Sequence, residues 1–371
     1  MQVNQERLLN EFLELVQIDS FAGEEREIAD RLMAKLTKLG LTVTEDDAGK
    51  AIDGNAGNLI ARLPGNAKKP TLMFCAHMDR VAPGKGIKPI VEDGIIHSDG
   101  TTILAADDVA GIVAILEAIR VIQEQNISHG DIEVVFTIAE EGGLNGAKGL
   151  DCSQLSAQFA YFLDSGGEIG TIINQAPSHQ NLDITFYGKA AHAGVSPEKG
   201  INAIKIAAEA VASMNIGRID AETTANVGII TGGAATNSVP DMCSIKCEAR
   251  SLNPVKLQTQ VQHMIDCAHT AAAKYGTKVD IAVNDCYPAF MIPETHPVIQ
   301  LAVKAAQQLG LTPQIHGTGG GSDANIINGK GLPSVVLGLN YKDVHSKNES
   351  MAVADLVKAA EYVATIIALA E

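Results

Sequence analysis

Short apolar runs recur along this chain, and they constrain its fold more than any other feature. Four of them are rich in Val, Ile, Leu and Phe and end in polar residues, at 70–79, 131–141, 158–165 and 332–340. Continuous apolar runs of strand length predict strands that are buried on both faces. Segments with apolar residues at helical spacing accompany them, at 4–18, 24–40, 109–126, 296–310 and 353–370. This alternation predicts an α/β fold with a mixed, mostly parallel sheet flanked by helices.

The pattern changes between residues 181 and 293. Residues 181–190 alternate between apolar and polar side chains, which is typical of a half-exposed strand. Further strands are expected at 225–233, 241–251 and 278–290, and helices at 202–214 and 254–276. We expect one sheet with helices on one face. The simplest organisation is an α/β domain of residues 1–180 and 294–371, interrupted by an inserted α+β domain of residues 181–293.

Composition limits the partners of this chain. A length of 371 residues fits about two domains. The formal net charge of -16 opposes binding to nucleic acid and attraction to anionic membranes. No segment resembles a signal peptide, and no apolar run reaches transmembrane length. The six cysteines form no CxxC pair, so we expect reduced thiols in a cytoplasmic protein.

Candidate functional residues follow the buried strands. In open α/β sheets, ligands bind where the carboxyl ends of the strands meet, an edge that we call the rim. The residues expected there are His77, Asp79, Glu140, Glu141, Asp164 and, after the fourth strand, His345. The doublet Asp107-Asp108 joins them, because it interrupts the apolar stretch 103–116 at the start of a helix. Carboxylates gathered on one rim would repel one another unless cations were bound between them.

Each of these residues has an ordinary alternative explanation. Asp107-Asp108 could cap a helix, Glu140-Glu141 could lie in a solvated loop, and Asp164 could end a strand in a turn. A single histidine such as His345 is usually a surface or core residue. Their joint placement is what indicates metal binding. Imidazole and carboxylate ligands suit zinc, cobalt or manganese, and this many acids fits two ions that share a carboxylate.

Five segments in this order resemble the dinuclear-zinc exopeptidases related to peptidase T, glutamate carboxypeptidase and aminoacylase. The segments are CAHMDRV, LAADDVAGI, TIAEEGGLNGAKGL, FLDS and KDVHSKNE. The resemblance covers nearly the whole chain and is strongest to the peptidase T-like group. It implies a phosphorylase/hydrolase-like catalytic core and an inserted, ferredoxin-like lid or dimerisation domain, and hence a possible homodimer.

The resemblance also implies roles for matching residues. Two divalent ions, zinc or alternatively cobalt or manganese, would be bound by His77, Asp107, Glu141, Asp164 and His345. Asp107 would bridge the ions and be joined to Asp108 by a cis peptide bond. Asp79 would support His77, and Glu140 would be the general base that deprotonates a metal-activated water.

Other matches lie in and after the inserted domain. His192 matches a histidine that stabilises the developing oxyanion, often from a neighbouring subunit, although it could be a simple surface residue. The substrate-binding positions match Asn237, Arg250, Gly320 and Ser322, with Ser322 and Asp323 capping a helix. The glycine-rich segment 317–331 could instead cradle phosphate, but it lacks a P-loop lysine. Gly319 replaces an arginine of peptidase T, which leaves strict tripeptide specificity open.

These observations together predict a cytoplasmic metallopeptidase that removes amino-terminal residues from short peptides, above all tripeptides. An amidohydrolase that removes the acyl group of an N-acyl amino acid would use the same residues. A catalytically inactive scaffold is the alternative outside enzymes.

Overall fold

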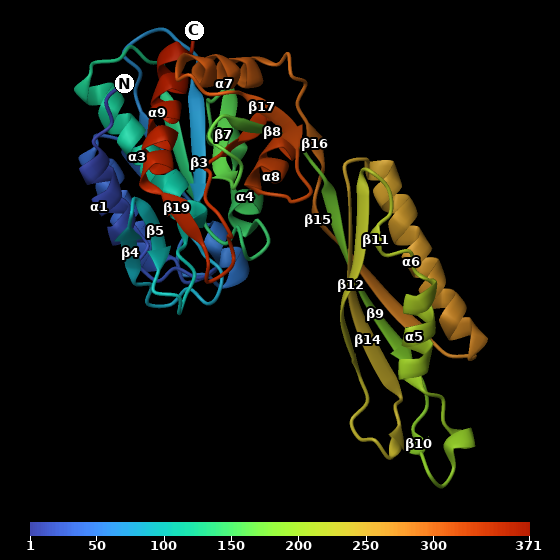
Figure 1. Cartoon of the computed structure of the whole chain (residues 1–371). Coiled ribbons are helices and arrows are strands. Elements are labelled where there is room, and N and C mark those ends of the chain that lie inside the picture. The colour runs from blue at the N-terminus through green and yellow to red at the C-terminus, as the bar shows by residue number, and fades with distance from the viewer. The chain divides into compact units, whose positions relative to one another are not determined.

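The computed structural model describes residues 1–371 and divides the chain into two compact units (Figure 1). The first unit contains residues 1–175, 291–317 and 322–371. The second unit contains residues 176–290 together with the short segment 318–321. The sequence placed residues 318–321 with the long α/β domain, so their association with the second unit is an additional feature of the structure.

A mixed nine-stranded sheet forms the centre of the first unit. Its order is β1 (Thr42–Glu45), β2 (Leu59–Leu63), β6 (Ile132–Thr137), β3 (Leu72–His77), β7 (Phe159–Ser165), β18 (Ser334–Gly338), β8 (Thr171–Ala176) and β16 (Phe290–Met291), with β17 (Gln314–Gly317) paired to β8. Strands β6, β3, β7 and β18 run parallel. The expected mixed, mostly parallel sheet is therefore confirmed, and its central strands are the four apolar runs.

Helices cover both faces of these central strands. The long ones are α1 (Gln5–Leu15), α2 (Arg26–Lys38), α3 (Ala106–Glu124), α7 (Pro297–Gln308) and α9 (Val353–Leu369), and the short ones are α4 (Asn145–Gly149) and α8 (Asp323–Gly329). Figure 1 shows α1, α3 and α9 on one side of the central strands and α4 and α8 on the other. Helix α3 packs against β3, β7, α1 and α9, which explains why its sequence is apolar on nearly every side.

The parallel register brings the carboxyl ends of the central strands to one rim. Strand β3 pairs with β6 from Leu72 opposite Ile132 to His77 opposite Thr137, and Leu72 also lies opposite Phe159 of β7. A small antiparallel sheet of β19 (Ser350–Ala352), β5 (Ile95–Ser98) and β4 (Pro89–Glu92) completes the unit, with turns η1 (Ala48–Ile52) and η2 (Cys152–Gln154).

The second unit is an antiparallel sheet with two helices on one face. Its main elements follow in the order β9 (Ser178–Tyr187), α5 (Ala203–Ser213), β12 (Thr223–Gly232), β14 (Met242–Ser251), α6 (Pro254–Lys274) and β15 (Val279–Tyr287). The strand order β12-β14-β9-β15, extended by β11 (Gly217–Arg218), is that of the ferredoxin-like motif. Alternate residues of β9, Leu182, Ile184 and Phe186, are buried beneath the helices. The unit also contains β10 (Ala191–His192), β13 (Ser238–Val239) and η3 (Pro197–Lys199).

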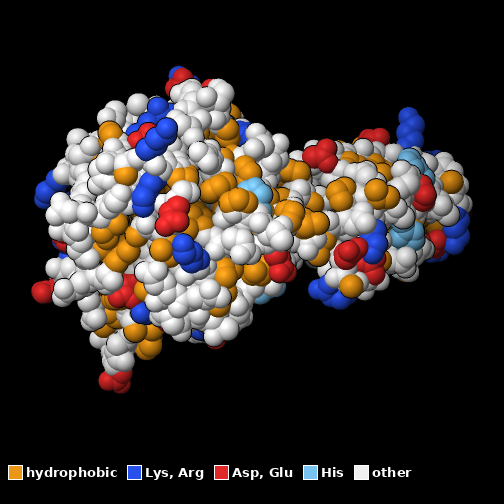
Figure 2. Space-filling view, turned by 90° about the horizontal axis from the view of Figure 1, so that it is seen from above, with side chains coloured by type: hydrophobic (Ala, Val, Ile, Leu, Met, Phe, Trp, Pro, Cys, Tyr) orange, Lys and Arg blue, Asp and Glu red, His pale blue; other side chains and the backbone are white.

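Charged side chains of both signs lie scattered among neutral and hydrophobic ones on the face seen in Figure 2. None of the helices combines the length and apolarity that crossing a membrane requires. All six cysteines are free thiols.

Candidate active site

The rim of the first unit gathers the predicted metal-binding residues. His77 ends β3, Asp164 lies near the end of β7, and Asp107 lies at the start of α3. Glu141 follows β6, and His345 lies in the loop between β18 and β19. Five segments that are distant in sequence thus converge because the central strands are parallel.

Asp107 lies between the two histidines. Its Oδ1 is 3.1 Å from Nε2 of His77, and its Oδ2 is 3.3 Å from Nε2 of His345. The same nitrogen of His345 is 2.8 Å from Oε1 of Glu141. These side chains therefore point their ligand atoms toward one another.

Two groups of potential ligands share Asp107. The first contains His77, Asp107 and Asp164, and the second contains Asp107, Glu141 and His345. Within each group the ligand atoms lie within 4.8 Å of one another. Imidazole nitrogens with carboxylate oxygens form a donor set that suits zinc and other divalent transition metals.

Burial and mutual repulsion shift the titration of this cluster. Burial raises the pKa of Asp164 well above the usual carboxyl value, and the charge of Asp107 raises it further. Glu140 has a pKa raised by burial and then by the charge of Asp164. Burial also acts to raise the pKa of Asp107, but hydrogen bonds from His345 and His77 outweigh it and hold that pKa well below normal. A divalent cation would remove much of this repulsion.

The two aspartates of the doublet have different surroundings. The peptide bond between Asp107 and Asp108 is cis, in agreement with the family resemblance. Asp108 accepts hydrogen bonds from the backbone N–H groups of His77 and Gly111, each at 3.2 Å. The helix-capping alternative therefore applies to Asp108, while Asp107 contacts the ligand cluster.

Asp79 contacts more than the histidine that it was expected to support. Its Oδ1 is 3.5 Å from Nδ1 of His77, whereas that nitrogen is 3.0 Å from the backbone carbonyl oxygen of Asp79. The carboxylate of Asp79 accepts backbone N–H groups from Glu140 at 2.9 Å and from Glu141 at 3.1 Å. Asp79 thus anchors the loop that carries both glutamates.

Two further buried acids near the rim were missed by the sequence reasoning. Glu349 accepts the backbone N–H groups of Leu104, Ala105 and Asp107 at 2.9, 2.9 and 3.1 Å. Glu25 accepts the N–H group of Ala139 at 3.0 Å. Both acids lie in strongly polar stretches, EEREIAD and HSKNES, which resemble exposed loops or helix starts. The local sequence carries no signal that distinguishes them.

Two residues that were predicted to share the active site, His192 and Arg250, lie far apart in the second unit. His192 in β10 lies opposite Ser238 of β13, and the carbonyl oxygen of Asn237 accepts the N–H group of Ala193 at 2.9 Å. Figure 1 shows β10 beyond the Met242 end of β14. Arg250 lies eight residues farther along β14 than Met242, and this separation corresponds to about 26 Å at the usual rise per residue of a strand. One copy of this unit therefore does not bring His192 and Arg250 together.

Arg250 already has a charged partner. Its Nη2 is 2.8 Å from Oε2 of Glu248, and that oxygen is 3.1 Å from Nε2 of His179. Gly320 belongs to the segment 318–321 of the second unit. Ser322 caps α8 in the first unit through a capping box with Asn325, as expected, whereas Asp323 is the first residue of the helix and not its cap.

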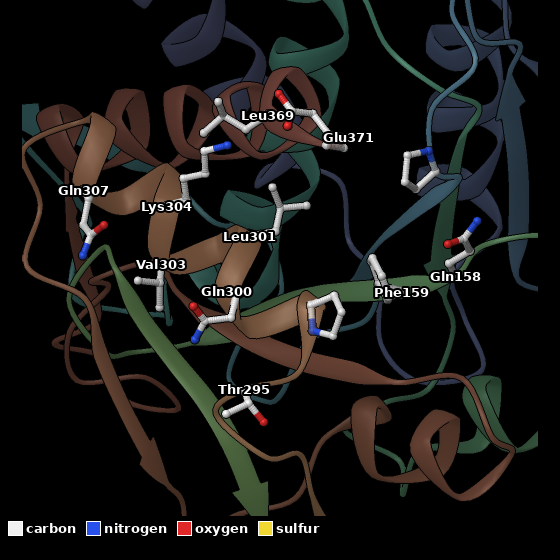
Figure 3. A pocket seen from close by; sticks show the side chains of 13 residues that line it. Gln158, Phe159, Thr295, Gln300, Leu301, Val303, Lys304, Gln307, Leu369 and Glu371 are labelled. Atoms are coloured by element: carbon white, nitrogen blue, oxygen red, sulfur yellow. The ribbon is translucent and has the colours of Figure 1, made fainter.

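A cavity of about 690 Å³ lies elsewhere in the first unit (Figure 3). It is lined by residues of α7 and the chain end, among them Lys304 and Glu371, and by Pro70 and Phe159 at the starts of β3 and β7. These are the amino ends of the strands, opposite the rim. The cavity lacks a cluster of metal-binding side chains, so the rim remains the candidate active site.

Comparisons with known proteins identify the family that this chain resembles along most of its length. The model of Peptidase family M20/M25/M40 matches residues 73–369. The crystal structure of aminopeptidase PepT from Bacillus cereus is 49% identical, covers 99% of both chains and has a TM-score of 0.92. A tripeptidase structure from Staphylococcus aureus is 44% identical over 99% of both chains, with a TM-score of 0.96. Peptidase T of Geobacillus thermodenitrificans is 30% identical over 99% of this chain and 98% of its own length.

Proposed function

The chain belongs to peptidase family M20/M25/M40 and is a metallopeptidase, and we propose that it is an aminopeptidase of short peptides, above all tripeptides. The observation that carries this proposal is the pair of ligand groups that share Asp107, with Glu140 beside them. The names aminopeptidase and tripeptidase of the two similar structures support the substrate class.

Two divalent ions would fit the two ligand groups. His77, Asp107 and Asp164 would hold one, and Asp107, Glu141 and His345 the other. Zinc is the first candidate, and cobalt and manganese are alternatives. When bound, such a pair polarises a peptide carbonyl group and makes a water molecule more acidic.

Glu140 would act as the general base. Its carboxylate lies in a group with His77 and Glu141 whose potential ligand atoms are within 4.8 Å of one another, so it faces the same space. Glu140 would take a proton from the attacking water and give it to the nitrogen of the departing amine. The hydrogen bonds from the amides of Glu140 and Glu141 to Asp79 would hold these neighbouring glutamates in their different positions.

The second unit would complete the site from a partner subunit. His192 and Asn237, which lie at the same end of this unit, would come from the partner subunit, where His192 would stabilise the developing oxyanion. Arg250, Gly320 and Ser322 would bind the carboxylate end of the substrate together with that Asn237. An extended tripeptide spans about 10 Å, whereas His192 and Arg250 of one chain are separated by the length of β14. We therefore propose a homodimer in which each active site receives His192 from the other subunit.

The free edge of β12 supports a dimer through this unit. Strand β11 pairs only with Thr224 and Ala225, so the outer edge of residues 226–232 has no strand beside it. Ile229 and Ile230 on this strand are exposed. Unpaired edges readily accept another strand. Sedimentation should show a dimer for the wild type and a monomer of low activity for Ile230→Lys, and a fully active monomeric wild type would refute the proposal.

Hydrolysis of a tripeptide and of its N-acetylated form tests the proposed activity. With zinc or cobalt added, we expect cleavage of the free-amine peptide alone, and we expect a chelator to abolish it. Cleavage of only the acetylated compound would indicate an acylase. Glu140→Gln should lose several orders of magnitude in kcat while metal stays bound, whereas Glu24→Gln, on an exposed side chain, should match the wild type.

A further inference from the structure

The loop that carries Glu140 is held by side chains rather than by a neighbouring strand. After β6 ends, four successive backbone N–H groups each donate to a side-chain oxygen. Asn58 accepts from Ile138 at 3.1 Å, Glu25 from Ala139 at 3.0 Å, and Asp79 from Glu140 and Glu141 at 2.9 and 3.1 Å. The three acceptors come from three separate segments of the first unit, so the loop is fixed from several directions.

Glu25 is the acceptor whose placement is hardest to explain by stability alone. Its side chain is fully buried, and it lies just before α2. Its Oε1 accepts the N–H groups of Gly23 and Ala139 at 3.0 Å each, while Oε2 has no hydrogen-bond partner. The adjacent Arg26 pairs with Glu45 and Asp30 instead. Burying a carboxyl group without a cation is costly, so a specific benefit should offset it.

The residue that Glu25 holds has an unusual backbone conformation. Ala139 has a φ of 47°, in the left-handed region that residues with a Cβ rarely adopt. Such conformations persist where surrounding contacts impose them, and they are frequent at functional sites. Ala139 directly precedes Glu140, so a change of its dihedral angles would redirect the Glu140 side chain.

We propose that Glu25 is a positioning residue for Glu140, which it orients by fixing the N–H group of Ala139. The inference rests on the proposed role of Glu140 as general base. Misplacement of a reacting group by about 1 Å can cost about 100-fold in rate. Loss of the Glu25 anchor should therefore lower kcat more than it alters substrate binding.

Three variants test this inference. Glu25→Ala removes the acceptor, Glu25→Gln retains an acceptor oxygen for Ala139, and Glu24→Ala is a matched control on the exposed neighbouring residue. We expect Glu25→Ala to lower kcat by about 10- to 100-fold at saturating zinc, with KM changed less than about three-fold and bound metal unchanged. Glu25→Gln should retain at least about a third of wild-type kcat.

Hydrogen exchange supplies a readout that does not depend on activity. In Glu25→Ala, a peptide covering residues 138–141 should exchange at least about ten-fold faster than in wild type, and in Glu25→Gln it should not. Should the alanine variant fail to fold, Glu25→Met fills similar space without an acceptor and carries the same expectations. Wild-type kcat or unchanged protection of these amides in the acceptor-free variants would overturn the inference.

The outcomes also separate this inference from the proposed function. A fully active Glu140→Gln variant would refute both the general base and its positioning. An inactive Glu140→Gln beside a fully active Glu25→Ala would leave the general base in place and refute only the positioning role. A wild type without peptidase activity would refute the proposed function, and the exchange data would then decide whether Glu25 fixes the loop.

Discussion

Replacing Asp79 by asparagine separates two roles of this carboxylate. One role is to orient His77, whose Nδ1 is 3.5 Å from the carboxylate but 3.0 Å from the Asp79 backbone carbonyl. The other is to accept the N–H groups of Glu140 and Glu141. The backbone carbonyl survives the substitution, so His77 keeps its shorter contact while the loop loses an acceptor.

The magnitude follows from the hydrogen bonds. Asparagine offers one oxygen and one NH₂ group, so one of the two loop amides faces a donor instead of an acceptor. A buried amide left unpaired costs about 1–3 kcal/mol, and the remaining bond loses its charge assistance. If about 3 kcal/mol were lost from the transition state, kcat would fall about 100-fold.

Tripeptide hydrolysis measured over a zinc titration tests this reasoning. For Asp79→Asn we expect kcat about 100-fold below wild type at saturating zinc, with the metal Kd raised less than about five-fold. Asp93→Asn, on an exposed turn residue, is the control and should match the wild type. Recovery of wild-type kcat at high zinc would show that Asp79 acts through His77 and would refute the anchoring role.

Three further predictions concern stability. Glu349→Leu removes the acceptor of three buried amides and should lower the free energy of unfolding, measured in urea, by about 3 kcal/mol. Glu349→Gln keeps an acceptor oxygen and should lose less than half of that. Equal losses in the two variants would show that these hydrogen bonds do not stabilise the fold. Gly321→Ala would place a Cβ 2.2 Å from Cζ of Tyr287 and should cost about 1–3 kcal/mol, whereas Gly228→Ala meets its nearest atom at 3.6 Å and should cost less. Melting curves with equal shifts for the two glycine variants would argue against this clash. Burial raises the pKa of Glu25 to about 7, so wild type should lose stability relative to Glu25→Gln as pH rises from about 4.5 through 7, by up to about 3 kcal/mol. A difference in unfolding free energy that stays constant between pH 4.5 and 8 would contradict this assignment.

Much of the first unit could be predicted because parallel strands share an edge. The apolar runs identified β3, β6, β7 and β18, and the polar residues at their ends had to meet once these strands ran parallel. His77 and Asp164 were found in this way. The buried acceptors Glu25 and Glu349 were not, because they bind amides 114 and up to 245 residues away, and local periodicity contains no information about such contacts.

The second unit shows a similar limit. Its strands and helices were predicted from alternation and helical spacing. The separation of His192 from Arg250 depends on the antiparallel pairing of β9 with β14, which places Tyr187 opposite Met242 and His179 opposite Arg250. The sequence motifs assigned both residues to one active site, but they contain no information about the distance between them.

The sequence by itself determined the classes of structure and chemistry. Burial of apolar runs dictates the sheet, and acids with histidines at strand ends dictate a cation site. Only the tertiary structure decided which acid does what. Asp107 contacts histidines while Asp108 binds amides, because the non-helical dihedral angles at the start of α3 turn these adjacent side chains in different directions. Those angles are set by packing and by distant acceptors such as Glu349, and neighbouring residues in a sequence do not specify them.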